Sequence, residues 1–253
     1  MFDVNTSIGH WPFRQLENNT PETLKNYLLQ YGITGAAVAH NHAACYMNVQ
    51  DANWELFRAI EEEKSGFFRG IATLNPLYAA WEKDLRCCAE QLNFRALRLL
   101  PAYHNYQLSD AAATEIITAA GELGLLVVIP NEIVNYRQRH WMENGIPQGT
   151  DTLIDTARRF PQVNFLFTEA NFPEKPSQPY PGNAYFEMSR FRNCFGRQLD
   201  NFIQLVGADH VLFGSGAPFK EIEPALIKLH HCRISEADRE LIAQGNAQKW
   251  FDC

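Results

Sequence analysis

The chain has 253 residues, of which 46% are hydrophobic and 12% aromatic, and its net charge is -7 with a pI near 5.6. That is enough apolar material for a real core, in one large α/β domain or in two smaller ones. The acidic balance and the lack of a lysine and arginine run argue against a nucleic-acid partner. No stretch approaches the ~18 uninterrupted apolar residues of a membrane span. Six cysteines without a Cys-x-x-Cys pair indicate reduced thiols and a cytoplasmic location.

Short apolar runs alternate with amphipathic segments along the whole chain. Strands are predicted at 2–5, 33–39, 67–74, 96–100, 125–129, 163–168, 184–188 and 211–213. Helices are predicted at 21–31, 49–64, 79–91, 109–122, 150–160, 195–206, 221–229 and 236–251. Thr20 and Pro21 suit the N-cap and first turn of the first helix, and Gly32 suits its end.

The strands read as near-continuous apolar runs, as strands buried on both faces do. Regular alternation of strand and helix predicts a parallel sheet, and eight such units in ~250 residues match the (β/α)8 barrel. An open doubly wound sheet is the main rival, but no Gly-x-Gly-x-x-Gly follows any strand. We therefore expect one α/β domain over residues 1–253, a single (β/α)8 TIM barrel with its chemistry at the carboxyl ends of the strands.

Those strand ends supply the candidate site residues. The loop after the first strand is dense in binding groups, although its aromatic residues could equally cap the core. A guanidinium at a strand end, as at Arg98, either anchors an anionic ligand or pairs with Glu169. The candidates for substrate binding are Arg98, Arg14, Trp11, Asn5, Ser7, His40, His42, Glu132, Asn171 and Ser215. The candidates for catalysis are His104, Glu169, Tyr103 and His10.

Four segments carry a resemblance to a known family: 2–9 (FDVNTSIG), 96–101 (ALRLLP), 211–219 (VLFGSGAPF) and 245–251 (GNAQKWF). Together they resemble the amidohydrolase-related (amidohydrolase 2) family of the amidohydrolase superfamily, whose members are metal-dependent hydrolases and decarboxylases. The likeness covers nearly the whole chain, and its first and third segments are the more specific. It implies a TIM barrel and a small-molecule substrate.

The metal ligands of that family do not carry over. The resemblance implies a His-x-His pair on strand one, histidines ending strands five and six, and an aspartate on strand eight. This chain has Asn5, Ser7, Pro130, Glu169 and Gly216 at these positions, and zinc favours imidazole, thiolate and carboxylate ligands. We therefore expect no cofactor. An alternative is a relocated divalent metal such as zinc at His40 and His42, with Cys45 nearby.

Three functions stay open. The first is a metal-independent hydrolase of a small carboxylated molecule such as a lactone or ester. Arg98 and Arg14 would fix the carboxylate, His104 or Glu169 would activate water, and Tyr103 or His10 would stabilise the oxyanion. The second is a catalytically inactive barrel that binds a small anionic metabolite. The third is a metal-dependent hydrolase or decarboxylase with a relocated site. The expected partner is a small anion, with no nucleic acid or membrane, and a homo-oligomer is left open.

Overall fold

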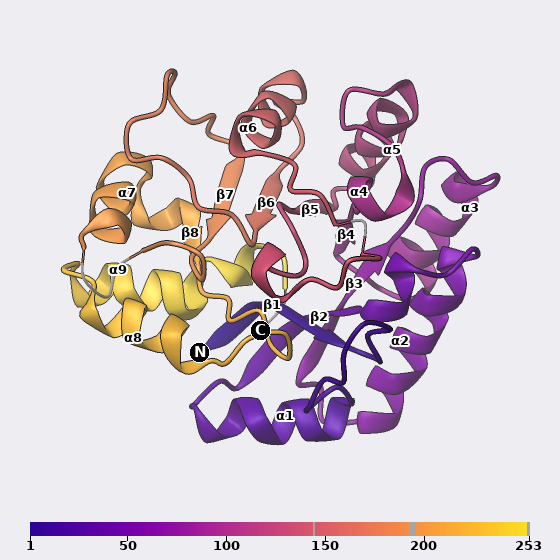
Figure 1. Ribbon diagram of the computed structural model, residues 1–253, viewed down its shortest axis with the longest axis horizontal. Coiled ribbons are helices and arrows are strands. Elements are labelled where there is room, and N and C mark those ends of the chain that lie inside the picture. The colour runs from indigo at the N-terminus through magenta and orange to yellow at the C-terminus, as the bar shows by residue number, and fades with distance from the viewer. Residues whose placement is uncertain (144, 193–195, 252–253) are drawn as a thin grey trace.

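The computed structural model describes residues 1–143, 145–192 and 196–251 of the protein (Figure 1). Eight strands form one sheet in chain order, and each pairs in parallel with the next. They are β1 (Phe2–Ile8), β2 (Gly35–His40), β3 (Phe68–Thr73), β4 (Ala96–Arg98), β5 (Leu126–Pro130), β6 (Phe165–Thr168), β7 (Ala184–Glu187) and β8 (Val211–Leu212). The prediction of a single (β/α)8 barrel is confirmed.

Backbone hydrogen bonds between β1 and the segment that follows β8 close the wall of the barrel. Val4 N donates to Phe213 O at 3.0 Å, and Ser7 N donates to Ala217 O at 3.0 Å. In the opposite direction Gly216 N donates to Asn5 O at 2.9 Å. The two sequence segments that carry the family resemblance most specifically therefore lie side by side.

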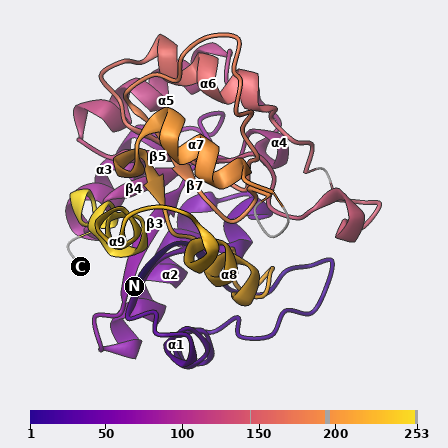
Figure 2. The same cartoon turned by 90° about the vertical axis from the view of Figure 1, so that its left-hand side faces the viewer.

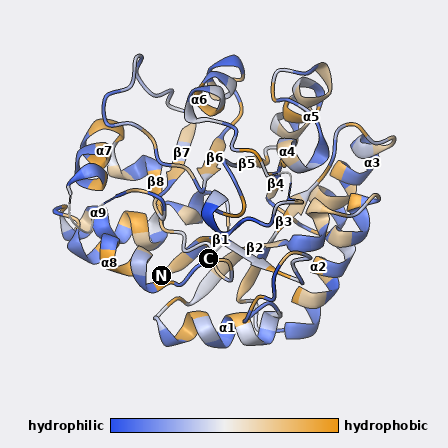
Figure 3. Cartoon of the chain, viewed as in Figure 1, coloured by the Kyte–Doolittle hydropathy of each residue, from blue (hydrophilic) through white to orange (hydrophobic). Residues whose placement is uncertain are grey.

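Helices surround the strands on the outside of the barrel (Figure 1). They are α1 (Pro21–Gln30), α2 (Val49–Glu63), α3 (Trp81–Arg86), α4 (Pro101–His104), α5 (Ala111–Glu122), α6 (Thr150–Arg159), α7 (Gln198–Val206), α8 (Glu223–His231) and α9 (Glu236–Glu240). Apolar residues gather on the strands, and polar residues cover much of the outer helix surface (Figure 3). None of the described helices is long and apolar enough to cross a membrane.

Several element boundaries differ from those expected. The α3 and α9 helices are shorter, because each passes into a π-helical turn, at Cys87–Gln91 and Leu241–Gly245 respectively. The short helix α4 was not predicted, and it begins at Pro101, where a first-turn proline loses no helical hydrogen bond. The predicted start, at Phe195, of the helix expected over 195–206 lies outside the described residues. The cap of α1 is as expected, since Thr20 Oγ1 accepts from Thr23 N at 3.3 Å.

The two ends of the barrel differ in how they are closed. At the amino-terminal end the ring of Phe2 stacks on that of Phe251 with centroids 5.6 Å apart. At the opposite end the long loops that follow β1 and β5 project together to one side of the molecule (Figure 2). The stacked rings of Phe2 and Phe251 close the amino-terminal end of the barrel. The carboxyl ends of the strands, where a barrel carries its chemistry, form the open face.

Candidate functional site

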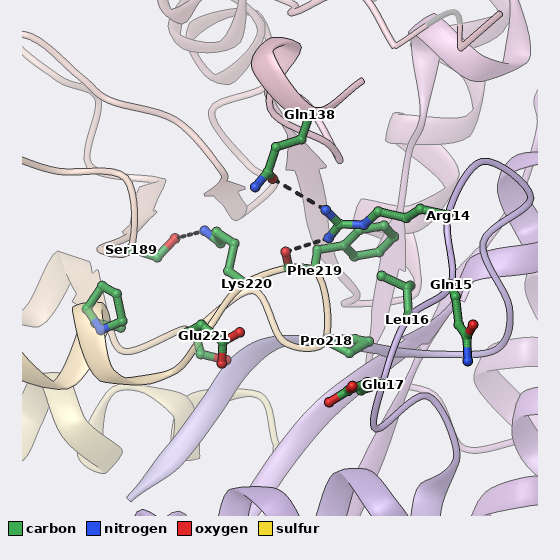
Figure 4. A pocket seen from close by; sticks show the side chains of 13 residues that line it. Arg14, Gln15, Leu16, Glu17, Gln138, Ser189, Pro218, Phe219, Lys220 and Glu221 are labelled. Carbon is green, nitrogen blue, oxygen red and sulfur yellow. Dashed lines mark hydrogen bonds between the residues drawn. The ribbon is translucent and has the colours of Figure 1, made fainter. Parts of the chain in front are cut away.

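Two adjoining cavities lie at the carboxyl ends of the strands. The larger, about 470 Å³, is lined in part by Arg14, Ser189, Phe219 and Lys220 (Figure 4). The second, about 260 Å³, shares three of these four residues and adds Arg137 and Arg190. It is therefore lined by four cationic side chains, Arg14, Arg137, Arg190 and Lys220, and none of the described residues in its lining is acidic. We call the two together the mouth cavity.

Arg14 is held across this cavity by contacts from two distant loops. Its Nη2 donates to Phe219 O at 2.6 Å, and its Nη1 lies 3.5 Å from Gln138 Oε1 (Figure 4). Its guanidinium carbon also lies 5.5 Å from the centre of the Phe219 ring, a cation–π contact. The guanidinium is thus positioned by the loops after β1, β5 and β8, although no carboxylate among the described residues forms an ion pair with it.

Glu169 is a buried carboxylate at the mouth that two cations bind. Its Oε2 accepts from Lys220 Nζ at 2.8 Å and from Arg190 Nε at 2.6 Å, and its Oε1 accepts from Asn5 Nδ2 at 2.8 Å. Burial opposes ionisation of this carboxyl, but the two cations outweigh burial and hold its pKa below the usual value. Glu169 also has a φ of +55°, a conformation that is uncommon outside glycine. This backbone conformation occurs directly after β6, at a residue whose side chain is held by three hydrogen-bond partners.

Glu187, at the end of β7, lies beside Glu169, and its pKa shifts in the opposite direction. Burial raises its pKa, and the neighbouring Glu169 charge adds to this effect while Lys220 opposes it. Ser189 Oγ donates to Glu187 Oε2 at 3.0 Å and accepts from Lys220 Nζ at 2.5 Å. Two carboxyls this close do not both ionise readily, so the pKa of Glu187 rises beside Glu169, whose own pKa two cations hold down.

A small cavity of about 40 Å³ lies deeper, in the centre of the barrel, with Asn5, Ser7, Arg98 and Glu169 in its lining. Phe219 lines both this cavity and the mouth cavity and so lies where the two adjoin. A space of this size and polarity can hold about one to three water molecules. It cannot hold a substrate ring.

Arg98 is fully buried but does not pair with Glu169, which corrects one of the two alternatives considered for it. Its Nε donates to Thr73 Oγ1 at 3.1 Å and its Nη2 donates to His40 O at 2.8 Å. Burial lowers its pKa to about 10, so it stays ionised at neutral pH. Carbonyl and hydroxyl oxygens within the barrel accept hydrogen bonds from its guanidinium and so stabilise the charge.

A second polar cluster lies at the end of β2, where His40 ends the strand and His42 follows in a 3-10 turn. Glu55, from α2, places Oε2 at 3.0 Å from His42 Nδ1 and 3.7 Å from His40 Nε2. Tyr46 Oη donates to Glu55 Oε1 at 2.9 Å and lies 2.8 Å from His42 Nδ1. Burial, together with the neighbouring His42, lowers the pKa of His40 to about 4, so its imidazole is neutral at pH 7.

The remaining candidates for catalysis lie apart from Glu169. His104 is buried, and its Nε2 lies 2.8 Å from Ala43 O. Tyr103 donates its hydroxyl proton to Glu143 Oε1 at 2.8 Å. The exposed His10 stacks on His42 with ring centroids 6.3 Å apart. None of these three is among the residues that line the mouth cavity.

The remaining candidates for substrate binding are partly structural. Trp11 is buried edge-on against Phe219, with ring centroids 5.3 Å apart. Glu132 forms 3.3 Å ion pairs with Arg139 and with Arg190. Ser215 lines the larger part of the mouth cavity, and its Oγ accepts from Ala217 N at 3.0 Å.

Asn171, the last of the candidates, is exposed. The residues that the structure adds to the candidates of the sequence analysis include Lys220, Gln138 and Glu55. Lys220 directly follows the strand-eight segment, so its position was a usable signal. Glu55 lies inside the helix α2, away from any strand end, so the sequence offered no signal for its place in the site.

The comparisons with known proteins agree with this fold. The amidohydrolase family model matches residues 8–253. This chain belongs to that family. A γ-resorcylate decarboxylase of a Polaromonas species is 34% identical over 87 residues, which are 34% of this chain and 27% of that protein, so the match spans only about a quarter of the relative's length.

Solved structures match over nearly the whole chain. A dihydroxybenzoic acid decarboxylase from Polaromonas, with bound manganese and the inhibitor 2-nitroresorcinol, has a TM-score of 0.68 at 18% identity, covering 99% of this chain and 96% of that one. A probable 2-pyrone-4,6-dicarboxylic acid hydrolase from Acinetobacter baumannii, with citric acid bound, has a TM-score of 0.67 at 11% identity, covering 100% and 99%. At these identities the likeness is one of fold.

The expectation of a chain without a metal cofactor is wrong. His40, His42 and Glu55 each offer a ligand atom within 4.8 Å of the others, and a solved structure of similar fold carries manganese. The expectation rested on the family's usual positions, where Asn5, Ser7, Pro130 and Gly216 remain poor ligands, whereas the alternative named His40 and His42, the two histidines of this cluster. The third ligand came from α2, which the sequence did not place beside the two histidines.

Proposed function

We propose that this protein is a hydrolase that binds a small carboxylated molecule in the mouth cavity and cleaves an ester or lactone bond in it. The observation that carries this proposal is the cationic lining of that cavity by Arg14, Arg137, Arg190 and Lys220 beside the buried carboxylate of Glu169. Guanidinium groups bind carboxylates through paired hydrogen bonds, and the part of the cavity that these four cations line has no acidic residue in its described lining. The names of the solved structures of similar fold also include aromatic or pyrone carboxylic acids.

Binding of the substrate changes the state of Glu169. Lys220 and Arg190 hold its pKa down against burial, and both also line the mouth cavity. A substrate carboxylate that draws these cations towards itself leaves burial as the dominant influence and adds a second negative charge. Both effects raise the pKa of Glu169. The carboxylate thus becomes a stronger base when substrate is present.

The reaction then needs one residue that acts first as general base and then as general acid, and we assign this role to Glu169. Glu169 also lines the central cavity, which has room for water. It takes a proton from a water molecule there as the water oxygen attacks the substrate carbonyl. When the carbon–oxygen bond of the ester or lactone breaks, Glu169 returns this proton to the leaving oxygen, so that acid and alcohol are formed from ester and water.

No step passes through a metal at the family's usual position. The residues there do not fit one, because Pro130 and Gly216 offer no side-chain donor and Glu169 is already bound by two cations. This misfit favours a second candidate function, a barrel that binds a small carboxylate without catalysis.

A panel of small esters and lactones, with and without a free carboxylate, tests the proposal. We expect hydrolysis only of carboxylated members, a rise in KM for Arg14→Ala, and a fall in kcat of at least ~100-fold for Glu169→Gln. Arg58→Ala, an arginine of α2 that donates to Trp54 O at 3.2 Å, is the matched control and should leave KM unchanged.

Thermal shifts separate the two candidates. If no ester is cleaved but carboxylates such as citrate raise the Tm, and Arg14→Ala removes that rise, the protein is the non-catalytic binder. If neither hydrolysis nor a shift is seen, the mouth cavity is not an anion site and both candidates are overturned.

A further inference from the structure

We propose that His40, His42 and Glu55 bind one divalent transition-metal ion of the zinc class at the rim of the barrel beyond β2. The facing atoms are Glu55 Oε2, His42 Nδ1 at 3.0 Å and His40 Nε2 at 3.7 Å. A tetrahedral zinc ion with bonds of about 2.0–2.1 Å places its ligand atoms roughly 3.3–3.4 Å apart. The observed separations lie on either side of that value. The site is independent of the mouth cavity and of the proposed hydrolysis.

Each ligand is held in place by the local backbone. His40 is buried at the end of β2, and Gly9 lies directly against its ring, since a Cβ on Gly9 would come within 2.7 Å of His40 Cε1. His42 lies in the 3-10 turn Asn41–Ala44, and Glu55 lies on α2. Tyr46 donates to Glu55 Oε1 at 2.9 Å, which leaves Oε2 facing the two imidazoles. Such a partner behind a metal ligand commonly orients it.

The charges around Glu55 also suit a cation. Among the described residues, the groups that contact its carboxylate are two imidazoles and a phenol, and no lysine or arginine is ion-paired with it. One negative charge and two neutral nitrogen donors are the ligand types that zinc prefers, whereas calcium and magnesium take oxygen ligands. Cys45 is not part of the cluster.

Metal entry gives up two hydrogen bonds, and one of them joins His42 Nδ1 and Glu55 Oε2 at 3.0 Å. His42 N now donates to His40 Nδ1 at 3.3 Å, so the ring proton of His40 is on Nε2. Coordination through Nε2 moves that proton to Nδ1 and gives up this long hydrogen bond. Three protein ligands leave the fourth position of a tetrahedral ion open to water or to another ligand, as in zinc sites that do chemistry.

Calorimetric titration of zinc chloride into the chelator-treated full-length protein tests the site. We expect one equivalent to bind, with affinity lowered more than ~100-fold by His42→Ala and by Glu55→Gln, and about 10-fold by Tyr46→Phe. Cobalt chloride should give visible absorption bands typical of a tetrahedral ion, which the same two variants abolish. These side chains are partly exposed, so both variants should fold even where a change at the buried His40 does not.

The matched control removes two other histidines. His230 and His231 are adjacent and exposed at the end of α8, and replacing both by alanine should leave zinc affinity unchanged. The proposal is overturned if zinc does not bind. It is equally overturned if binding persists in His42→Ala and Glu55→Gln, or if the α8 variant weakens binding as much as they do.

Discussion

Asn5 donates hydrogen bonds to two buried carboxyls, those of Glu169 and Asp3, and the neighbours of each carboxyl determine the direction of its pKa shift. Glu169, at the mouth, accepts from Lys220 and Arg190, and its pKa is lowered despite burial. Asp3, inside the barrel wall, has no cationic partner among the described residues, and its Oδ1 accepts from the backbone N–H groups of Asn5 and Ser215, both at 3.0 Å. Burial raises the pKa of Asp3 to about 7, with those hydrogen bonds opposing and Glu187 adding to the rise.

The comparison shows that hydrogen bonds alone do not ionise a buried acid here, whereas two cations do. The two carboxyls also oppose each other in pH dependence. The lowered pKa of Glu169 stabilises the folded state above the ordinary pKa of glutamate, and this contribution is lost as pH falls through the folded value. The raised pKa of Asp3 has the opposite sign, because the folded state binds the proton more tightly, and stability is lost as pH rises from about 4 to about 7.

The largest expected loss of stability comes from removing the charge of Glu169, the carboxyl that is held by two cations. Glu169→Gln leaves Lys220 and Arg190 without a central anion, and we expect the free energy of unfolding to fall by about 3–5 kcal/mol at pH 7. Urea denaturation followed by circular dichroism measures it. Asp155→Asn is the control, since its 3.0 Å pair with Arg158 is exposed and should be worth less than about 1 kcal/mol. Equal losses in the two variants would mean that the ion pairs of Glu169 contribute no more than surface pairs.

The next effect tests Asp3 through its pH dependence. Asp3→Asn removes the titration, so the variant should gain about 2–3 kcal/mol of stability relative to the wild type between pH 5 and pH 8. Its side-chain oxygen can still accept from Asn5 and Ser215. Paired urea titrations at the two pH values give the difference. A stability difference that is the same at both would show that Asp3 is ionised in the folded protein at pH 5, as Glu169 is.

The smallest effect extends the comparison to Glu55, whose partners are two imidazoles and a phenol and which is partly exposed to water. Glu55→Gln without metal should change the free energy of unfolding by no more than about 1 kcal/mol. Differential scanning calorimetry in the presence of a chelator measures the change in Tm. A loss of stability as large as that of Glu169→Gln would show that the charge of Glu55 stabilises the fold without a metal ion, which would argue against a metal-binding role.

The barrel was predictable because its signals are local. Apolar runs buried on both faces, alternation with helical periods, and caps such as Thr20 before Pro21 depend on residues close in sequence. The rim residues Arg14, Glu169, His40 and His42 were found for the same reason, since each lies at or just after a strand end. Boundaries such as the π-helical end of α3 were missed because packing sets them.

The sequence by itself determined the fold, the family and the list of polar groups at the open end of the barrel, including the absence of the family's metal ligands at Asn5, Ser7, Pro130 and Gly216. Only the tertiary structure decided which groups meet. It assigned Glu169 to Lys220 and Arg190 and not to Arg98, and it placed Glu55 of α2 beside His40 and His42. The physical reason is that a strand end fixes where a side chain starts, whereas its partner comes from another loop or helix, and closure of the barrel sets that distance.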